Sequence, residues 1–238
     1  MKRIGLLGGM SWQSTAEYYR LLNELAADRL GGLHSAECVL FSVDFAEIER
    51  LQVESRWDEA GAILADAAAA LERAGAQVLL ICTNTMHKVA DQVQAAIHIP
   101  LLHLADATAQ AVQAQGISRV GLLGTAFTME QDFYRGRLEQ HALKVLTPDA
   151  PGRALVHRVI YDELCLGIVR DESREAYRRV IADLVDAGAE GVILGCTEIE
   201  LLIAQEDCPV PVFPTTRLHA EAAIAFALAP DAAHDEQQ

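Results

Sequence analysis

The amino-acid sequence predicts an α/β protein with two pseudosymmetric domains, each a parallel sheet flanked by helices. Two observations carry this prediction. Short apolar runs alternate along the chain with segments of helical periodicity, and the same order of motifs occurs twice. At 238 residues, of which 51% are hydrophobic and 22% charged, the chain is long enough to bury the core that such a fold requires.

The two halves of the sequence align in three places. RIGLLGGMSWQSTAEYY, from residue 3, aligns with RVGLLGTAFTMEQDFYR, from residue 119, so that Gly8 corresponds to Gly124. LERAGAQVLLICTN aligns with LVDAGAEGVILGCTE and, with one inserted residue, pairs Cys82 with Cys196. IPLLHLADATAQA aligns with VPVFPTTRLHAEA. Because the three pairs occur in the same order, we interpret them as an internal duplication.

The individual elements follow from the apolar pattern. Residues 2–8 and 118–124 are short apolar runs that end in glycine, as buried parallel strands do. The segment after the first of these runs has apolar side chains at helical spacing. Residues 57–74 are rich in alanine and are followed by Gly75, which predicts a helix that ends there.

The same pattern continues to the end of the chain. Further strands are expected at residues 77–82 and 191–196, and a further helix at residues 107–116. Such alternation predicts parallel sheets with crossover helices. Residues 231–238 are expected to be an acidic tail.

Charge and cysteine content exclude several classes of protein. A net charge of −15 argues against nucleic-acid binding, which needs clustered Lys and Arg. The start, MKRIGLLGGMSW, is too short and glycine-rich for a signal peptide, and no apolar run is long enough for a membrane span. The five cysteines are not spaced as a disulfide framework, so we expect a reduced, cytoplasmic protein.

Glycine-rich turns follow the first strand of each half. Neither GLLGGMS nor GLLGTAFT is a dinucleotide-binding or P-loop motif. They are expected to form tight strand-to-helix turns, and their N–H groups are equally compatible with holding a small anion. Met10 in the first turn, with Thr125 and Thr128 in the second, are candidate substrate-binding residues.

Cys82 and Cys196 each end an apolar run, where ligands bind in open parallel sheets. If the halves face each other, both sulfurs reach one cleft and can move a proton on opposite faces of a carbon atom. A helix N-terminus stabilises a thiolate by roughly 0.3 to 1 kcal/mol, which predicts a modestly lowered thiol pKa. Donors to the substrate are expected from the polar residues that follow the cysteines, Thr83, Asn84, Thr85 and Thr197.

The remaining chemistry-bearing residues are interpreted as structural. Cys38, Cys165 and Cys208 are expected in the core, and His87 and His219 are more typical of structural than of catalytic histidines. No metal site is expected, because the chain has neither C-x-x-C nor H-E-x-x-H. No lysine lies in a setting suited to a Schiff base, so no cofactor is expected.

The motifs CTNTMHK and LGCTEI, together with GLLGGMSWQSTAEYY, MEQDFYRGRL and ELCLG, resemble those of the aspartate/glutamate racemase family. The resemblance extends over nearly the whole chain and is strongest to the aspartate-racemase or broad-specificity branch. It implies a cofactor-independent amino-acid racemase that uses Cys82 and Cys196. It also implies a site between the two domains and a homodimer. Thr83 after the first cysteine, and Glu198 where histidine is usual, point away from the glutamate enzymes.

The resemblance also implies that the C-terminal helix packs on the first domain. We therefore predict one domain from residues 1–103 with 215–230, and a second from residues 104–214. Three alternatives remain open on this fold: a maleate-type cis–trans isomerase, a cysteine hydrolase, and a non-catalytic small-molecule binding module. The hydrolase would use His87 or His219 as its base and Glu198 to orient that base.

Residues 44–57 are expected to be a connector that covers the site, although a merely solvated connector is also possible. Family members that prefer aspartate are expected to place an arginine here, where this chain has Gln52, with Arg50 and Arg56 nearby. Glutamine lacks the charge and the bidentate fork that favour a carboxylate. We therefore expect relaxed substrate preference, with Gln52 and Glu198 among the substrate-binding residues.

Overall fold

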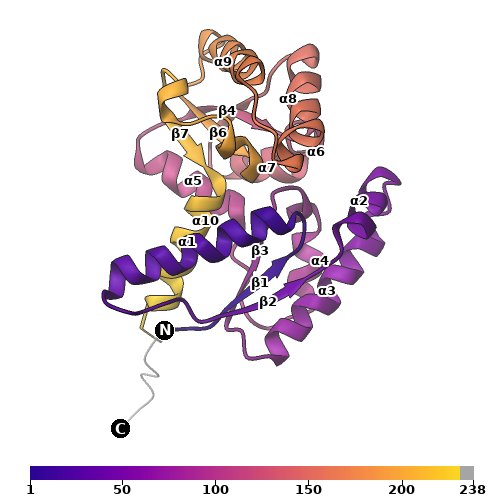
Figure 1. Ribbon diagram of the computed structural model, residues 1–238, viewed down its shortest axis with the longest axis vertical. Helices are drawn as coiled ribbons and strands as arrows, with labels where there is room; N and C mark the ends of the chain where they lie inside the picture. The colour runs from indigo at the N-terminus through magenta and orange to yellow at the C-terminus, as the bar shows by residue number, and fades with distance from the viewer. Residues whose placement is uncertain (231–238) are drawn as a thin grey trace.

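Two parallel sheets form the framework of the computed structural model, which describes residues 1–230 (Figure 1). The predicted acidic tail, residues 231–238, lies outside the described residues. The first sheet has three strands, in the order β2 (Cys38–Ser42), β1 (Ile4–Gly8) and β3 (Val78–Ile81). The second has four, in the order β5 (Lys144–Leu146), β4 (Arg119–Gly124), β6 (Gly191–Gly195) and β7 (Val212–Pro214). The predicted fold class is confirmed.

Helices join the strands and cover the sheets. In chain order the α-helices are α1 (Trp12–Leu30), α2 (Phe45–Val53), α3 (Trp57–Arg73), α4 (Ala90–Ala95), α5 (Leu104–Ala114), α6 (Ala126–Glu130), α7 (Asp132–Gln140), α8 (Ala150–Asp162), α9 (Asp171–Asp186) and α10 (Thr215–Leu228). Short 3-10 helices are η1 (Thr85–Val89), η2 (Leu164–Leu166), η3 (Thr197–Leu201) and η4 (Gln205–Asp207). None of the described helices is long and apolar enough to cross a membrane.

The two sheets repeat one arrangement, which agrees with the internal duplication. In the first sheet β1 lies between β2 and β3, and β3 leads into the CTNTMHK motif. In the second sheet β4 lies between β5 and β6, and β6 leads into the LGCTEI motif. The equivalent of β7 in the first sheet is a single bridge between Leu79 and Leu101. Leu79 N donates to Pro100 O at 2.9 Å, and Val192 N donates to Pro211 O at the same distance. The predicted correspondence of Pro100 with Pro211 is therefore confirmed.

The strand register corrects one predicted correspondence. Gly5 of β1 pairs with Leu79, and Gly121 of β4 pairs with Val192. Leu79 and Val192 are thus equivalent, and no residue is inserted within either paired strand. An insertion there would send every later side chain to the opposite face of the sheet.

Counting along the equivalent strands from this pair places Cys82 on Gly195 and Thr83 on Cys196. The predicted pairing of Cys82 with Cys196 is therefore wrong by one residue. The residue that stands where Cys196 stands is Thr83.

The C-terminal helix α10 lies against α1 (Figure 1). Its buried face includes several alanines, among them Ala220 and Ala223, which pack in one cluster with Tyr18 of α1. Lys2 N also donates to Ala227 O at 2.8 Å. Small residues let two helices approach closely, so the end of the chain covers the first sheet. The exact domain boundaries at residues 103 and 214 remain a prediction.

Residues 44–57, expected to be a connector, instead contain helix α2. Its first turn is capped by Asp44, whose Oδ1 accepts a hydrogen bond from Ala46 N at 3.1 Å. Ile48 and Leu51 are 0% and 2% exposed, so one face of the helix is part of the core. The spacing of these two buried residues is helical, so the segment is an ordered helix packed on the core. Gln52 lies on the buried side of this helix.

The first glycine turn also differs from its prediction. Gly5 and Gly8 lie within β1, and Gly9 makes the turn with φ of 95°. The N–H of Gly9 donates to Thr15 Oγ1 at 2.8 Å, so it is not free to hold an anion. A Cβ at Gly9 would overlap the backbone of Val43.

Replacing Gly9 with alanine is therefore expected to destabilise the protein by about 2 kcal/mol or more, from left-handed strain plus the overlap with Val43. Gly116→Ala is the matched control, because its φ is 71° and an added Cβ has no neighbour within 4 Å. That change is expected to cost only about 1 kcal/mol. Urea unfolding measures both, and equal losses would show that the overlap with Val43 is unimportant.

Candidate active site

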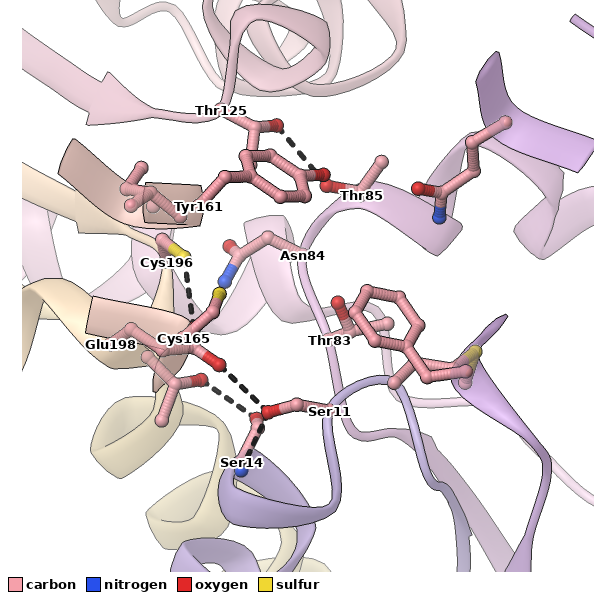
Figure 2. Close-up of a pocket in the computed structure, with 16 residues that line it drawn as sticks. Ser11, Ser14, Thr83, Asn84, Thr85, Thr125, Tyr161, Cys165, Cys196 and Glu198 are labelled. Atoms are coloured by element: carbon pink, nitrogen blue, oxygen red, sulfur yellow. Dashed lines mark hydrogen bonds between the residues drawn. The ribbon is translucent and has the colours of Figure 1, made fainter. Parts of the chain in front are cut away.

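A pocket opens where the carboxyl ends of strands from both sheets meet (Figure 2). This is the edge at which parallel sheets bind ligands. Its lining combines polar side chains with several apolar or sulfur-bearing ones. The lining residues are Met10, Ser11, Ser14, Phe45, Gln52, Thr83, Asn84, Thr85, Thr125, Ile160, Tyr161, Cys165, Gly195, Cys196, Thr197 and Glu198.

Cys196 directly follows β6 and lines this pocket. Its Sγ donates to Glu198 Oε2 at 3.0 Å, and Ser11 Oγ donates to the other oxygen, Oε1, at 2.8 Å (Figure 2). Cys196 and Glu198 are both 8% exposed. The thiol and the carboxylate therefore form a buried pair, held in place from the opposite domain by Ser11.

The pKa of Cys196 is raised well above its ordinary value, first by burial and then by the charge and hydrogen bond of Glu198. The modest lowering predicted from a helix N-terminus is therefore wrong. The helix that follows, η3, is a 3-10 helix of five residues, whose dipole is too short to outweigh these effects. At neutral pH Cys196 is therefore a thiol.

Cys82 does not line the pocket. It is 0% exposed and packs in the cluster that contains Tyr18 and Ala220. Its Sγ lies 4.0 Å from Leu80 O, and burial raises the pKa of its thiol. The prediction that two sulfurs approach one cleft is thus contradicted for Cys82, because the strand register turns this side chain to the helix-covered face.

The residues after Cys82 do line the pocket. Thr83 is part of the wall, and Thr85 Oγ1 lies 3.2 Å from Thr125 Oγ1, which joins the two halves by a hydrogen bond. Asn84 Nδ2 donates to Thr215 Oγ1 at 3.2 Å, whereas its Oδ1 is buried without a partner. An orphaned acceptor in a pocket wall is a place for a ligand donor.

Most other predicted substrate-binding residues also reach the pocket. Met10 lines it, as does Gln52, whose Nε2 donates to Met86 Sδ at 3.0 Å. Thr197 Oγ1 lies between Ser14 Oγ, at 2.9 Å, and Thr216 Oγ1, at 2.8 Å. Both neighbours hold Thr197 at the pocket wall.

Thr128 is the exception among the predicted residues. It is fully buried, packs against Gly124 and Gly195, and hydrogen bonds to Thr125 at 3.2 Å. It does not line the pocket. Its role is therefore to support the turn that carries Thr125.

Several lining residues were not predicted: Ser11, Ser14, Phe45, Ile160, Tyr161, Cys165 and Gly195. Ser11 had a recognisable signal, since serine before a helical segment caps a helix, and Ser14 N donates to its Oγ at 3.2 Å. Cys165, predicted to be a core residue, is partly buried and brings a second thiol to the pocket from η2. Burial raises the pKa of this thiol to about 12.

No Lys, Arg or His side chain of residues 1–230 lines this pocket. Arg50 and Arg56 lie outside it and pair with Glu54, at 3.0 and 2.7 Å. Within the same residues, no group of three or more His, Cys, Asp or Glu side chains is arranged to hold a metal ion. In the described part of the chain, the ionisable lining groups are thus the two thiols, the Tyr161 phenol and Glu198.

The two histidines of the hydrolase alternative are buried outside the pocket. His87 Nε2 accepts a hydrogen bond from Leu104 N at 3.2 Å, so its Nδ1 donates to Thr83 O at 2.8 Å. His219 Nδ1 lies 2.8 Å from Tyr18 OH. Burial lowers the pKa of His87 to about 4 and that of His219 to about 3. Neither is a base for Cys196, and His87 instead fixes the backbone of Thr83.

The thiol–carboxylate pair yields a prediction about reactivity. Glu198→Gln removes the charge that raises the pKa of Cys196, so the thiolate fraction should rise. We expect several-fold faster alkylation of Cys196 by iodoacetamide at mildly alkaline pH, measured by peptide mass spectrometry. Glu206→Gln, an exposed carboxylate on η4, serves as the control and should change nothing. Unchanged or slower alkylation in Glu198→Gln would contradict the role of this charge.

Known proteins share this fold and sequence. A structure described as a candidate Asp/Glu racemase from Yersinia pestis is 56% identical, covers 96% of this chain and 100% of that chain, and has a TM-score of 0.91. An aspartate racemase homologue from Pyrococcus horikoshii OT3 is 36% identical over the same shares, with a TM-score of 0.85. The broad specificity amino-acid racemase RacX of Bacillus subtilis (strain 168) is 20% identical over 95% of this chain and 98% of its own length.

The sequence profile described as Asp/Glu/Hydantoin racemase matches residues 7–223, which is most of the chain. This match agrees with the resemblance expected from CTNTMHK and LGCTEI. The pocket described above lies within the matched residues. The chain belongs to the Asp/Glu/hydantoin racemase family.

Proposed function

We propose that this chain is an amino-acid racemase in which Cys196 moves the α-proton on one face of the substrate and Thr83 acts on the other. The observation that carries this proposal is the strand register, which gives Thr83 and Cys196 equivalent positions on the two sheets, both at the wall of one pocket. Inversion of a stereocentre requires proton-transfer groups on opposite faces of one carbon.

The homologues support the reaction class. They are racemases, and enzymes of this family work without pyridoxal phosphate. The protein is an isomerase of this kind. Among residues 1–230 no lysine lines the pocket to form a Schiff base, and we assign the proton transfers to the side chains that do line it.

The pocket supplies groups for each part of an amino acid. The unpartnered Oδ1 of Asn84 and the carboxylate of Glu198 are acceptors for the α-ammonium group. The hydroxyls of Thr85 and Thr125 are donors for the α-carboxylate. Donors aimed at this carboxylate stabilise the enediolate that forms when the α-proton leaves, which lowers the barrier to its removal.

The two faces are chemically unequal. Cys196 has a carboxylate partner that can share its proton, whereas Thr83 has a hydroxyl whose backbone is held by His87. We propose that Cys196 is the acid and base on its face. Thr83 delivers a proton on the other face and regains one from water.

The substrate class follows from charge. A second substrate carboxylate would enter a pocket that already holds Glu198 and that no cationic side chain of residues 1–230 lines. Burying an unpaired charge is costly, whereas a neutral polar group can hydrogen bond to Gln52 or Tyr161. We therefore propose a preference for amino acids with uncharged polar side chains. We still expect a homodimeric, cytoplasmic protein, and size-exclusion chromatography tests whether it is a dimer.

Three single substitutions test the catalytic assignment. Cys196→Ala is expected to reduce racemisation by at least about 100-fold, and Thr83→Ala by a comparable factor, because each removes a proton-transfer group. Cys82→Ala should retain activity within a few-fold, since this thiol is outside the pocket. Polarimetry or chiral chromatography measures the rates. Loss of activity in a folded Cys82→Ala protein would restore the two-cysteine mechanism.

Steady-state rates on a panel of amino acids test the substrate class. We expect kcat/KM for homoserine to exceed that for aspartate and glutamate by at least about tenfold, with an apolar amino acid as control. Gln52→Arg should shift this ratio toward aspartate by adding a cation to the wall. A wild-type protein that accepts only aspartate would show that a cation reaches the substrate from outside the described pocket.

A further inference from the structure

A second pocket lies behind Glu198, on the far side of the wall from the substrate pocket. Its lining residues are Gln13, Ser14, Glu17, Arg20, Thr197, Glu198, Glu200 and Leu201. Three of these, Ser14, Thr197 and Glu198, also line the first pocket. Glu198 is therefore the one ionisable side chain of residues 1–230 that both pockets share.

Glu198 is also in direct contact with the reactive thiol. Its Oε2 accepts from Cys196 Sγ at 3.0 Å, which is a distance over which a proton can pass. Its Oε1 accepts from Ser11 Oγ at 2.8 Å, so the carboxylate is fixed on both oxygens. Such a carboxylate can receive a proton from the substrate side without moving.

We propose that Glu198 takes the proton of the Cys196 thiol and exchanges it with water through the second pocket. The proposal rests on the racemase function proposed above. It gives Glu198 the role of a positioning and proton-holding residue that acts through Cys196. Protons would then exchange through the second pocket, whereas the substrate enters the first.

The steps balance without any redox partner. The S–H bond of Cys196 breaks and an O–H bond forms on Glu198 Oε2, which leaves a thiolate. The thiolate takes the α-proton, so the Cα–H bond breaks, an S–H bond forms, and the electron pair remains on the substrate as an enediolate. Thr83 protonates the opposite face and takes a proton from water, and the hydroxide so formed is neutralised by the proton that Glu198 releases. Glu198 releases that proton to water in the second pocket while the enediolate is still bound. It can then take the proton that Cys196 received from the substrate, pass it to water and return one from water to sulfur, which restores the starting charges.

The second pocket contains a further group suited to proton exchange. Glu200 lines it, and the Oε1 atom of Glu200 is buried without a hydrogen-bond partner. Burial raises the pKa of this carboxyl to about 7, so near neutral pH it can both accept and release a proton. It stands two residues from Glu198 on η3. Bound substrate blocks the first pocket but leaves this side open to water.

The test follows deuterium at the α-carbon. Substrate labelled there is incubated in ordinary water, and the unreacted enantiomer that Cys196 deprotonates is recovered. In the wild-type protein, deuterium taken up by Cys196 should be lost to water before it can return. Leu201→Trp fills the second pocket, so the fraction of recovered substrate that keeps deuterium should rise several-fold. Leu33→Trp, a fully exposed position outside either pocket, is the matched control and should match the wild type.

Substitutions of Glu198 give a second measurement. Glu198→Gln should lower kcat by about 100-fold and should also increase deuterium retention. Glu198→Asp keeps the carboxylate and should recover part of both effects. If Glu198 only supported the structure, its substitution would lower kcat without changing the fraction of recovered substrate that keeps deuterium.

The outcomes separate this inference from the proposed function. If the wild type racemises but Leu201→Trp and Glu198→Gln lose deuterium as the control does, the exchange route is wrong and the racemase remains. If the wild type neither racemises nor exchanges its α-proton, both proposals are overturned.

Discussion

The parallel pairing of β1 with β3 and of β4 with β6 determines which residues at the ends of β3 and β6 line the pocket. In a paired strand each residue faces the side opposite to its neighbour, so register alone decides which side chain reaches the pocket at the carboxyl end. Glycines allow the close packing behind this edge: a Cβ at Gly195 would lie 2.9 Å from Leu123 O. The hydrogen bond between Thr85 and Thr125 then joins the two sheets at this edge.

A single carboxylate sets the electrostatics of the site. Burial and then Glu198 raise the pKa of the Cys196 thiol, and no cationic side chain of residues 1–230 lines the pocket to offset this effect. The same charge that suppresses the thiolate provides a nearby acceptor for its proton. A buried thiol without a carboxylate beside it would also form little thiolate, but it would have no nearby acceptor for its proton and would be a poor base.

The fold was largely predictable, because alternating apolar runs and helical segments report burial directly, as α3 and α5 show. The position of Cys82 was not, since apolar runs do not reveal which residue of one strand is level with which residue of the next. Likewise, the helical spacing of Ile48 and Leu51 is too short a pattern to separate α2 from a connector. Cys165 and Tyr161 line the pocket because elements far apart in the sequence meet there, and the sequence pattern does not report such contacts.

The comparison of Cys82 with Cys196 shows how similar motifs can have different roles. Both cysteines follow apolar runs and precede threonine, yet Cys82 packs beneath α1 and α10 while Cys196 lines the pocket. A duplication gives two equivalent strand ends, but it does not require the same residue at both. Because a carboxylate accompanies only Cys196, the two faces of the pocket differ in acid–base strength. A racemase built in this way would run its two half-reactions with unequal proton-transfer groups, and its equilibrium would still be fixed by the substrate alone.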